Sequence, residues 1–236
     1  TFSNGDIPTV NDCSFGIYPS TRDILNYASN IDIEPNLDRL CESGYRFKKK
    51  NKYELFFDSA QIGPAFNPGH GHNDVFNFIL YIEKIPFIVD TGTSTYNFSK
   101  RRLKEKSTSS HNTVSINGQE QSEIWSNFRV AKRANPKIIQ ENDYQIIAQY
   151  ISLQKNIYHQ REINFYESKI LLKDVVNNDH LNYSYLHFHP SIDIEVRENS
   201  IMTSMAEIKF SGFKEIKVED YSYAEGFNLL KNSKKL

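Results

Sequence analysis

The sequence predicts an all-β fold: an antiparallel β-sandwich of stacked, supersandwich-like sheets with a short irregular or helical N-terminal extension. Aromatic residues make up 13% of the 236 residues, with 14 Tyr and 16 Phe, and both types are typical of half-buried strands. Beyond residue 44, short segments rich in such residues are separated by Asn, Asp, Gly or Ser. Because these segments do not alternate with helical patterns, the sequence favours antiparallel sheets over βαβ units.

Residues 1–42 form the extension. Turn signals surround one helical segment, for which Ser20 or Thr21 is the expected N-cap and Asp23 the acidic residue of the first turn. Pro35 interrupts the segment that follows. We therefore interpret the extension as the end of a preceding domain or as a linker packed on the core.

The strands are expected from Tyr45 onward. Two hairpins come first, over residues 45–58 and 76–90, and Asn117-Gly118 is a strong signal for a tight turn. The Lys-rich end, residues 231–235, is expected to be a solvated tail. Further strands are expected over residues 113–116, 128–134, 144–152, 157–166, 169–176, 183–189, 192–196, 206–210 and 215–219.

Charge and hydropathy exclude several classes of function. A net charge of −1 gives no global basic field, so neither nucleic acid nor an anionic membrane surface is an expected partner. No run of about 18 apolar residues exists, so no membrane span is predicted. Cys13 and Cys41 are too few for a disulfide scaffold; they could form one bridge or be small buried apolar residues. The start at Thr1, without a signal peptide, suggests a processed product or an excised fragment.

The densest polar cluster runs from Asn67 to Asp74 and contains Gly-His-Gly-His. In extended backbone, residues i and i+2 face the same side. His70 and His72 are therefore expected to face one site, where the intervening glycines would leave room for a ligand. Imidazoles bind zinc and transfer protons near neutral pH. An exposed polar loop is the competing interpretation.

Asp90 and His111 extend this cluster. Asp90 ends an apolar strand, where a buried carboxylate is costly unless it is paired or binds a cation, and the hairpin over 76–90 can bring it beside His72. Together, His72, Asp90 and His111 match a zinc site with an open fourth position, whereas calcium prefers oxygen ligands. In the competing interpretation, Asp90 caps a turn and His111 is a hydrogen-bonded loop histidine.

A second set of residues could bind an acidic sugar. Guanidinium groups pair with carboxylates, and aromatic faces suit sugar rings, although ordinary salt bridging on strand faces is the better explanation for most of the set. The substrate-binding candidates are Asn67, Tyr96, Arg102 and Arg129. The other members are Arg101, Glu120, Trp125, Lys132 and Arg133. A structural role is favoured for the strand residues His187 and His189.

Taken together, these motifs resemble the heparinase II/III family. The resemblance rests on Asn67-Pro-Gly-His-Gly-His-Asn-Asp, Pro86-Phe-Ile-Val-Asp-Thr-Gly, Ser107-Thr-Ser-Ser-His-Asn-Thr-Val, Asn117-Gly-Gln-Glu-Gln and Phe128-Arg-Val-Ala-Lys-Arg-Ala. It is strongest over residues 43–135. It implies that residues 43–236 are a heparinase II/III-like β-sandwich domain and that residues 1–42 end a preceding α/α toroid domain or link to it.

The resemblance implies a polysaccharide lyase that cleaves a uronic-acid-containing acidic polysaccharide by β-elimination, in a cleft between toroid and sandwich. His70 is then the catalytic histidine of the cleft, and one divalent metal, most simply zinc, binds His72, Asp90 and His111 as structural support. The family's tyrosine acid/base belongs to the toroid, so this chain would hold an incomplete active site. A periplasmic or extracellular location is implied. Lys106 stands where many relatives have Arg, which keeps the charge and loses the bidentate fork.

Other functions compete with this one. A non-catalytic carbohydrate-binding module would explain the aromatic residues but not the His/Asp set. A glycoside hydrolase needs two carboxylates flanking the bond, which could come from Asp74, Asp90, Glu120 and Glu123. A cupin-type metal enzyme is disfavoured by the long interval between Asp90 and His111. The product separates a lyase from a hydrolase, since only a lyase leaves a conjugated double bond that absorbs in the ultraviolet.

Overall fold

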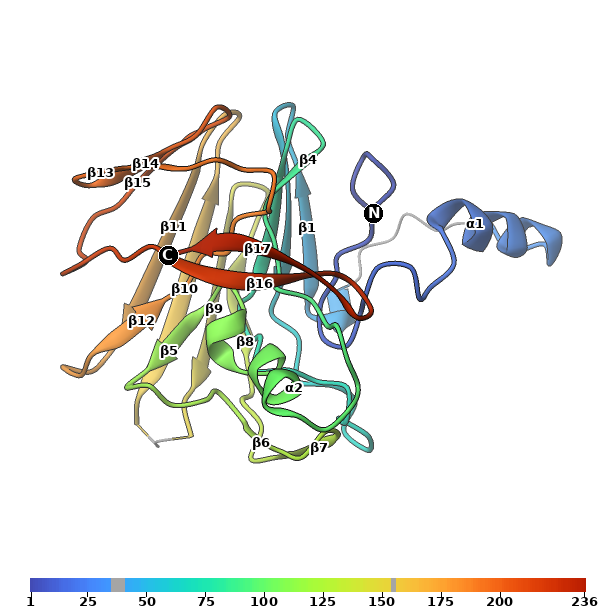
Figure 1. Cartoon of the computed structure of the whole chain (residues 1–236), viewed down its shortest axis with the longest axis horizontal. Coiled ribbons are helices and arrows are strands. Elements are labelled where there is room, and N and C mark those ends of the chain that lie inside the picture. Colours follow the sequence, from blue (N-terminus) through green and yellow to red (C-terminus); the bar gives the residue numbers. More distant parts are fainter. Residues whose placement is uncertain (35–40, 154–155) are drawn as a thin grey trace.

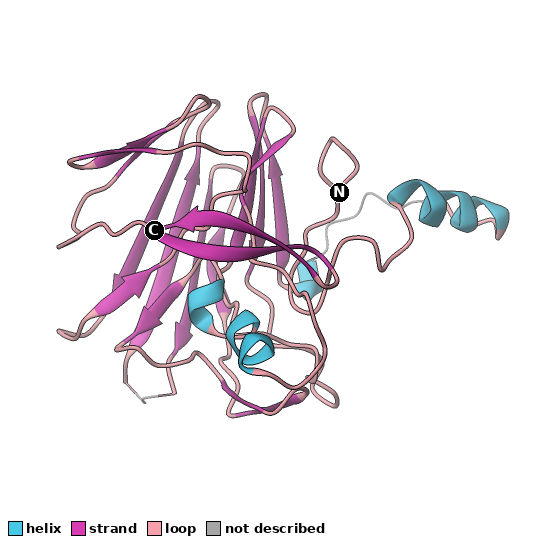
Figure 2. Cartoon of the chain, in the orientation of Figure 1, coloured by secondary structure: helices cyan, strands magenta, loops and turns pink. Residues whose placement is uncertain are grey.

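Antiparallel strands carry the fold, as the sequence predicts. The computed structural model describes residues 1–34, 41–153 and 156–236. Two four-stranded sheets stack face to face, and four smaller sheets surround them (Figure 1). Strands and loops make up nearly the whole body, and the longest helix stands apart from it (Figure 2). The fold is therefore an all-β sandwich with a short helical N-terminal stretch.

The first large sheet has the order β1-β2-β3-β4. Its strands are β1 (Tyr45–Lys49), β2 (Tyr53–Asp58), β3 (Phe78–Ile82) and β4 (Ile85–Ile88). Both predicted hairpins are present, since β1 pairs with β2 and β3 pairs with β4. Every residue of β2 is buried: Leu55 and Phe57 join the main core, whereas Phe56 joins a small cluster with Phe2 on the other face.

The second large sheet has the order β11-β10-β9-β8. Its strands are β8 (Lys137–Glu141), β9 (Gln145–Ile151), β10 (Tyr158–Phe165) and β11 (Ile170–Val176). Buried and less buried residues alternate along β9 and β10, as expected for an antiparallel sheet with one face on the core. Ile146, Tyr150 and Ile163 meet the first sheet in the shared apolar core.

The smaller sheets lie around this sandwich. They comprise β5 (Val114–Ile116) with β12 (Asn182–Ser184), β6 (Glu123–Trp125) with β7 (Arg129–Ala131), β13 (Glu195–Arg197) with β14 (Ser200–Met202) and β15 (Glu207–Lys209), and β16 (Glu219–Gly226) with β17 (Leu229–Lys235). The β6–β7 hairpin lies near α2 at the lower edge of the body in Figure 1.

The prediction of a solvated tail at residues 231–235 is wrong. These residues belong to β17, which pairs with β16 along its length. Their lysine side chains pair with acidic side chains on the neighbouring strand β16: Lys234 lies 2.7 Å from Asp220 and Lys235 lies 3.2 Å from Glu219. Cross-strand pairs of opposite charge stabilise such a hairpin, so a run of lysines here is compatible with a strand.

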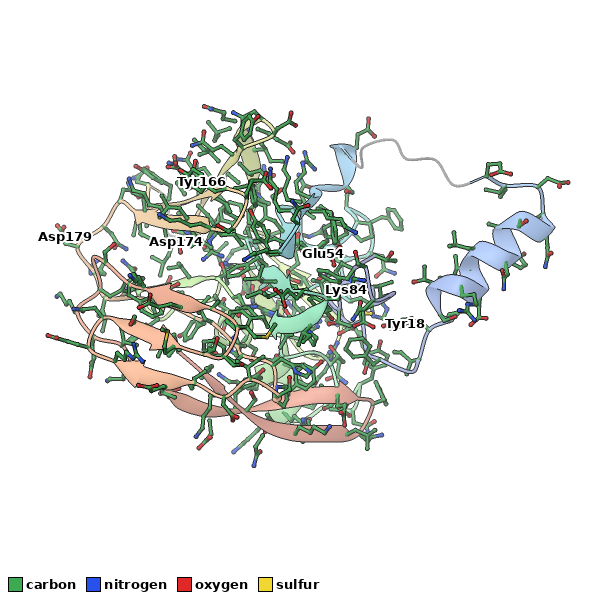
Figure 3. The ribbon with its side chains drawn as sticks, turned by 90° about the horizontal axis from the view of Figure 1, so that it is seen from above. Tyr18, Glu54, Lys84, Tyr166, Asp174 and Asp179 are labelled. Carbon is green, nitrogen blue, oxygen red and sulfur yellow. The ribbon has the colours of Figure 1, made fainter. Side chains whose placement is uncertain are left out.

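Helix α1 (Thr21–Asn30) begins after the N-cap Ser20, as predicted, and Asp23 completes a capping box with it. None of its residues is buried. The helix projects away from the sheets, which the view from above shows clearly (Figure 3). Neither α1 nor any other described helix is long and apolar enough to cross a membrane.

The sequence did not predict α2 (Lys100–Glu105), a short helix with Ser99 as its N-cap. Six residues are too few for an apolar periodicity to be visible. The helix matters for the site because the side chains of Arg102 and Glu105 are buried in the protein. Two 3-10 turns, η1 (Cys41–Ser43) and η2 (Thr108–Ser110), complete the helical structure of the described residues.

The segment ahead of α1 packs on the outer face of the first sheet. Phe2 stacks on Tyr81 with ring centroids 3.9 Å apart, and Ser3 donates to the Glu54 carboxylate from its backbone N–H at 2.9 Å and from its hydroxyl at 2.7 Å. These contacts fix the path of the chain toward the functional site. Cys13 in this segment is a free thiol, and the side chain of Cys41 lies outside the described residues.

Candidate functional site

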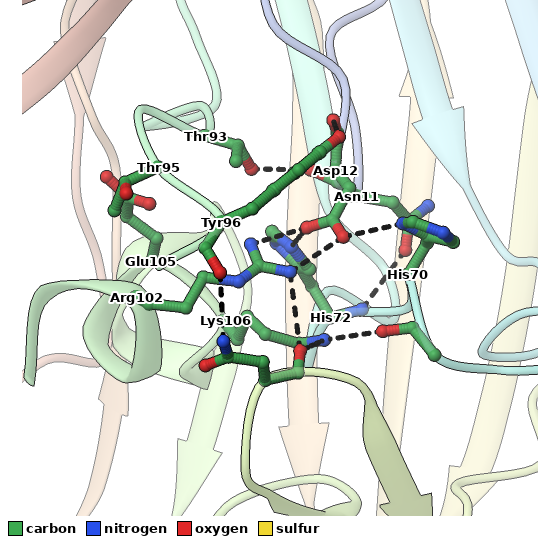
Figure 4. A network of polar contacts seen from close by, with 12 residues as sticks. Asn11, Asp12, His70, His72, Thr93, Thr95, Tyr96, Arg102, Glu105 and Lys106 are labelled. Carbon is green, nitrogen blue, oxygen red and sulfur yellow. Dashed lines mark hydrogen bonds and ion pairs between the residues drawn. The ribbon is translucent and has the colours of Figure 1, made fainter. Parts of the chain in front are cut away.

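Three segments that are distant in the sequence meet around one buried carboxylate, that of Asp12 (Figure 4). The N-terminal segment supplies Asn11 and Asp12, the loop between β2 and β3 supplies His70 and His72, and α2 supplies Arg102. Backbone N–H groups of the loop donate hydrogen bonds to the N-terminal segment and to the end of α2. His72 donates its N–H to the Asn11 side chain at 3.1 Å, and the residue after it donates to the backbone carbonyl at the end of α2 at 3.0 Å.

Asp12 binds three side chains at once. Its Oδ2 lies 2.8 Å from Nδ1 of His70, and its Oδ1 lies 2.8 Å from Nε2 of His72. Arg102 approaches from the other side, with Nη2 2.6 Å from Oδ2 and Nη1 2.5 Å from Oδ1. Burial raises the pKa of Asp12, but the hydrogen bonds and charges of His72 and Arg102 outweigh burial and hold this pKa well below its usual range. Asp12 is therefore an ionised carboxylate.

No sequence pattern singles out Asp12. The pair Asn11-Asp12 has the composition of a turn, and Asn11 does have a positive φ of 54°. Its partners lie 58, 60 and 90 residues away in the sequence. A lone aspartate in an irregular segment is indistinguishable from a solvated one until the fold brings these partners to it.

His70 and His72 face the same carboxylate, as their i, i+2 spacing predicts, but their exposure differs. The side chain of His70 is 66% exposed, and that of His72 is 0% exposed. The ring of His70 stands edge-on to Phe128 and Tyr96, with centroids 5.4 and 6.2 Å away. His70 is thus an imidazole that solvent can reach, with a buried negative charge behind it.

The glycines of Gly-His-Gly-His serve packing and do not open space for a ligand. A Cβ on Gly71 would lie 2.5 Å from the side chain of Ile62, and one on Gly69 would lie 2.9 Å from the backbone oxygen of Phe128. The expectation that these glycines leave room for a bound molecule is wrong for that reason. They allow the loop to lie directly against its neighbours, which fixes the direction of the two histidines.

The predicted metal ligands His72, Asp90 and His111 are all fully buried. Asp90 hydrogen-bonds to His111: its Oδ2 is 2.7 Å from Nδ1 of His111 and accepts from Asn77 at 2.6 Å, and its Oδ1 accepts from the Gly92 N–H at 2.9 Å. The rings of His72 and His111 have centroids 5.4 Å apart. Burial lowers the pKa of His72 to about 4, so its imidazole is neutral, as metal binding requires.

Whether these residues suit a metal can be tested on their unused atoms. Nδ1 of His72 and Nε2 of His111 are buried without a hydrogen-bond partner, which is costly for a polar atom. Two imidazoles with free buried nitrogens fit a cation that takes nitrogen ligands, although the charge and hydrogen bond of Asp90 outweigh burial and raise the pKa of His111, so a metal there would have to displace a proton. Among the described residues, no three His, Cys, Asp or Glu side chains already converge as a ligand set. Asp90 would have to add a ligand bond to its present hydrogen bonds.

Arg102 and Lys106 are buried cations that hold the site together. The Arg102 guanidinium lies 5.3 Å from the ring centre of Tyr96 and 5.5 Å from that of Phe128, and its side chain is 0% exposed. Lys106 donates to the backbone oxygens of Gly69 at 2.9 Å and Asn127 at 3.1 Å. Burial lowers the pKa of Lys106 to about 8.

The exposed rim of the site carries the remaining substrate-binding candidates. Arg129 lies over the ring of Trp125 at 5.1 Å, and Trp125 is 52% exposed. Asn67 is exposed, and Tyr96 is half-buried with its hydroxyl donating to the backbone oxygen of Asp12 at 2.9 Å. The structure therefore separates the predicted set into an accessible group and Arg102, which lies beneath it.

Residues 33–235 match the family model described as Heparinase II/III-like, C-terminal. The chain belongs to this family. Solved structures agree on the fold: a heparan sulfate lyase HepC from Pedobacter heparinus has a TM-score of 0.71 at 16% identity, and a heparinase III has 0.71 at 17%. A second heparinase III structure has a TM-score of 0.72 at 11% identity. A search of curated proteins found no match.

The heparinase-like chain spans about two-fifths of the length of these solved structures. It is covered over 98% by the comparison with the Pedobacter lyase, of which it covers 40%, and over 99% by that with the heparinase III, of which it covers 42%. At these identities the likeness shows the fold. The family match begins at residue 33, so Asp12 lies outside it.

Proposed function

We propose that this chain is the C-terminal β-sandwich part of a polysaccharide lyase that cleaves uronic-acid-containing acidic polysaccharides by β-elimination. The observation that carries the proposal is the exposed imidazole of His70 backed by the buried carboxylate of Asp12, in a chain of the heparinase II/III-like family. Solved structures with the same fold are named heparinase III and heparan sulfate lyase, which supports the same substrate class.

The chemistry needs a group like His70. The C5 proton of a uronate is poorly acidic, and its removal is eased when a positive or hydrogen-bonding group neutralises the adjacent carboxylate. A base then takes the proton, and an acid protonates the leaving glycosidic oxygen. His70 suits the carboxylate or proton role, because its ring is accessible and Asp12 orients it through Nδ1. The other acid/base would come from an N-terminal α/α toroid domain of the same protein.

The exposed residues at the rim of the site would bind the acidic polysaccharide. Arg129 offers a guanidinium for a uronate carboxylate or sulfate, beside the exposed face of Trp125. Tyr96, whose ring neighbours that of His70, and the exposed Asn67 are further candidates. Arg102 has no exposed surface in this structure, so a direct contact with substrate would require Tyr96 and Phe128 to move. Its contacts support a role in holding Asp12.

The proposed metal would be zinc-like, held by the free nitrogens of His72 and His111 with Asp90 as the carboxylate. When bound, it would cross-link the loops that carry these residues and so support the loop of His70. This chain's own part is to present two imidazole nitrogens in a buried position. Metal analysis of undialysed protein that finds no stoichiometric zinc, manganese or calcium would contradict this part of the proposal.

A carbohydrate-binding module without catalysis is the second candidate, and the exposed Trp125–Arg129 pair favours it. The reaction product separates the two. The full-length protein, incubated with acidic polysaccharides that contain uronate, is expected to release products with ultraviolet absorbance from a conjugated double bond. Binding without any product would favour the module, and new reducing ends without absorbance would identify a hydrolase.

A further inference from the structure

One carboxylate faces two histidines with different nitrogens. Asp12 meets Nδ1 of His70 through Oδ2 and Nε2 of His72 through Oδ1, each at 2.8 Å. The side chain of Asp12 is 5% exposed, so water cannot readily replace either contact. This asymmetry has a chemical consequence for both rings.

An ionised carboxylate only accepts hydrogen bonds, and a neutral imidazole carries its proton on one nitrogen. The nitrogen that faces Asp12 must therefore carry the proton. His70 becomes the Nδ1–H tautomer, which leaves the lone pair of Nε2 on a ring that is 66% exposed. His72 becomes the Nε2–H tautomer, which leaves the lone pair on Nδ1, the buried atom without a partner. The partner of one ring nitrogen sets the state of the other.

Arg102 keeps Asp12 in its acceptor role. Its guanidinium faces both carboxylate oxygens, at 2.5 and 2.6 Å, and its own position is fixed by the rings of Tyr96 and Phe128. A fixed cation beside a buried carboxylate stabilises the ionised form. Each oxygen of this ionised carboxylate then has one histidine nitrogen at 2.8 Å.

We propose that Asp12 is a positioning residue that sets opposite tautomers in His70 and His72, so that the N-terminal segment completes the site. The proposal rests on the proposed lyase function only where turnover is concerned. It assigns a role to a residue that lies before the family-matched region. The exposed nitrogen of His70 is thereby made a proton acceptor, and the buried nitrogen of His72 a lone-pair donor to a cation.

The direct test is the protonation state of each ring nitrogen, read from magic-angle-spinning ¹⁵N spectra of the full-length protein with ¹⁵N-labelled histidine. His70→Gln and His72→Gln identify the two signals. The wild type is expected to show protonated Nδ1 in His70 and protonated Nε2 in His72, the latter with or without metal on Nδ1. Protonated Nε2 in neutral His70, or protonated Nδ1 in His72, would overturn the proposal.

Asp12→Asn probes the cause. The carboxamide replaces one acceptor oxygen with a donor, so at least one of the two histidines is expected to change its tautomer. In full-length enzyme, kcat is expected to fall by about 100-fold with KM changed less than about threefold, and Asp12→Glu to recover part of the loss. Asp6→Asn, in the same segment and hydrogen-bonded to Tyr81, is the matched control and should leave both spectra and kcat unchanged.

The outcomes separate this inference from the proposed function. Unchanged tautomers in folded Asp12→Asn would overturn the role of Asp12, whatever the activity. Absence of unsaturated product from the wild type would sink the lyase function and leave the spectral test intact. If Asp12→Asn does not fold, the wild-type spectra alone decide, because the predicted pair of opposite tautomers is either present or absent.

Discussion

The side chains of His70 and His72 lie two residues apart and face one carboxylate, but solvent reaches only the first. His70 is 66% exposed and has aromatic neighbours at its edge, whereas His72 is fully buried beside His111. A group that must touch a polysaccharide has to be accessible, and a ligand for a structural metal does not. Their different surroundings therefore support a division of roles inside Gly-His-Gly-His.

This division can be measured with two substitutions in the full-length protein. His70→Ala is expected to lower turnover by about 100-fold or more, the scale of losing a proton-transfer or charge-stabilising group, and to leave the metal content nearly unchanged. His72→Ala is expected to lose metal and stability, because the binding free energy is available only to the folded site. Equal loss of metal in both variants would make His70 a ligand and refute the division.

At the scale of elements, a second buried ion pair joins the two large sheets to the site. Arg161 on β10 is fully buried and donates its guanidinium to Asp174 on β11 at 2.8 Å. Its Nη1 also donates to the backbone oxygens of Phe76 and Asn112, each at 2.6 Å. Phe76 follows the histidine loop, and Asn112 follows His111. The second sheet thus fixes the segments that carry two of the three proposed metal ligands, His72 and His111.

This pair predicts a pH dependence of stability. Burial raises the pKa of Asp174, but the charges of Arg161 and His159 outweigh it and hold the pKa well below its usual range. A depressed pKa in the folded state contributes stability above the unfolded value of about 3.9 and loses it as pH falls further. Asp174→Asn is expected to be less stable than wild type by about 3 kcal/mol at pH 7, with the difference shrinking below about pH 4.

Urea unfolding of the 236-residue chain at a series of pH values measures this difference. Asp179→Asn is the matched control, because Asp179 is exposed, and its effect should stay within about 0.5 kcal/mol at every pH. A constant difference between wild type and Asp174→Asn down to pH 2 would contradict the assignment, since it would mean that the charge of Asp174 does not contribute.

At the scale of the whole molecule, helix α1 projects away from the β-sheets (Figure 3). Its apolar side chains Ile24, Leu25 and Tyr27 are exposed. The chain covers about 40% of the solved lyase structures that it resembles. Both observations agree with the proposal that a toroid domain of the same protein completes the cleft. His70 and the rim residues would then form one wall of that cleft.

The proposal predicts that the isolated 236 residues show no lyase activity or only a trace, because the second acid/base is absent. The full-length protein should give unsaturated products from the same polysaccharide, measured by ultraviolet absorbance under equal conditions. Robust turnover by the isolated chain would place the whole acid/base set within it. The search would then turn to Tyr96, His187 and His189.

The sequence by itself determined the antiparallel class of the fold, its first two hairpins and the position of the histidine cluster. Strand identity depends on a period of two residues, and the hairpins over 45–58 and 76–90 close within a few residues, so both are written in local sequence. The same local spacing placed His70 and His72 on one side. Strand β17 was not predicted, because a run of lysines resembles a solvated tail. Its lysines pair with acidic residues on β16, and only the strand pairing shows this.

Tertiary structure decided how the cluster works. Asp12 reaches Arg102 across 90 residues of sequence, and Arg161 reaches the Phe76 carbonyl across 85. No local pattern encodes such contacts, because a buried carboxylate and a solvated one have the same neighbours in the chain. Which nitrogen of each histidine is free, and which arginine is hidden beneath the rim, follow from packing between distant segments.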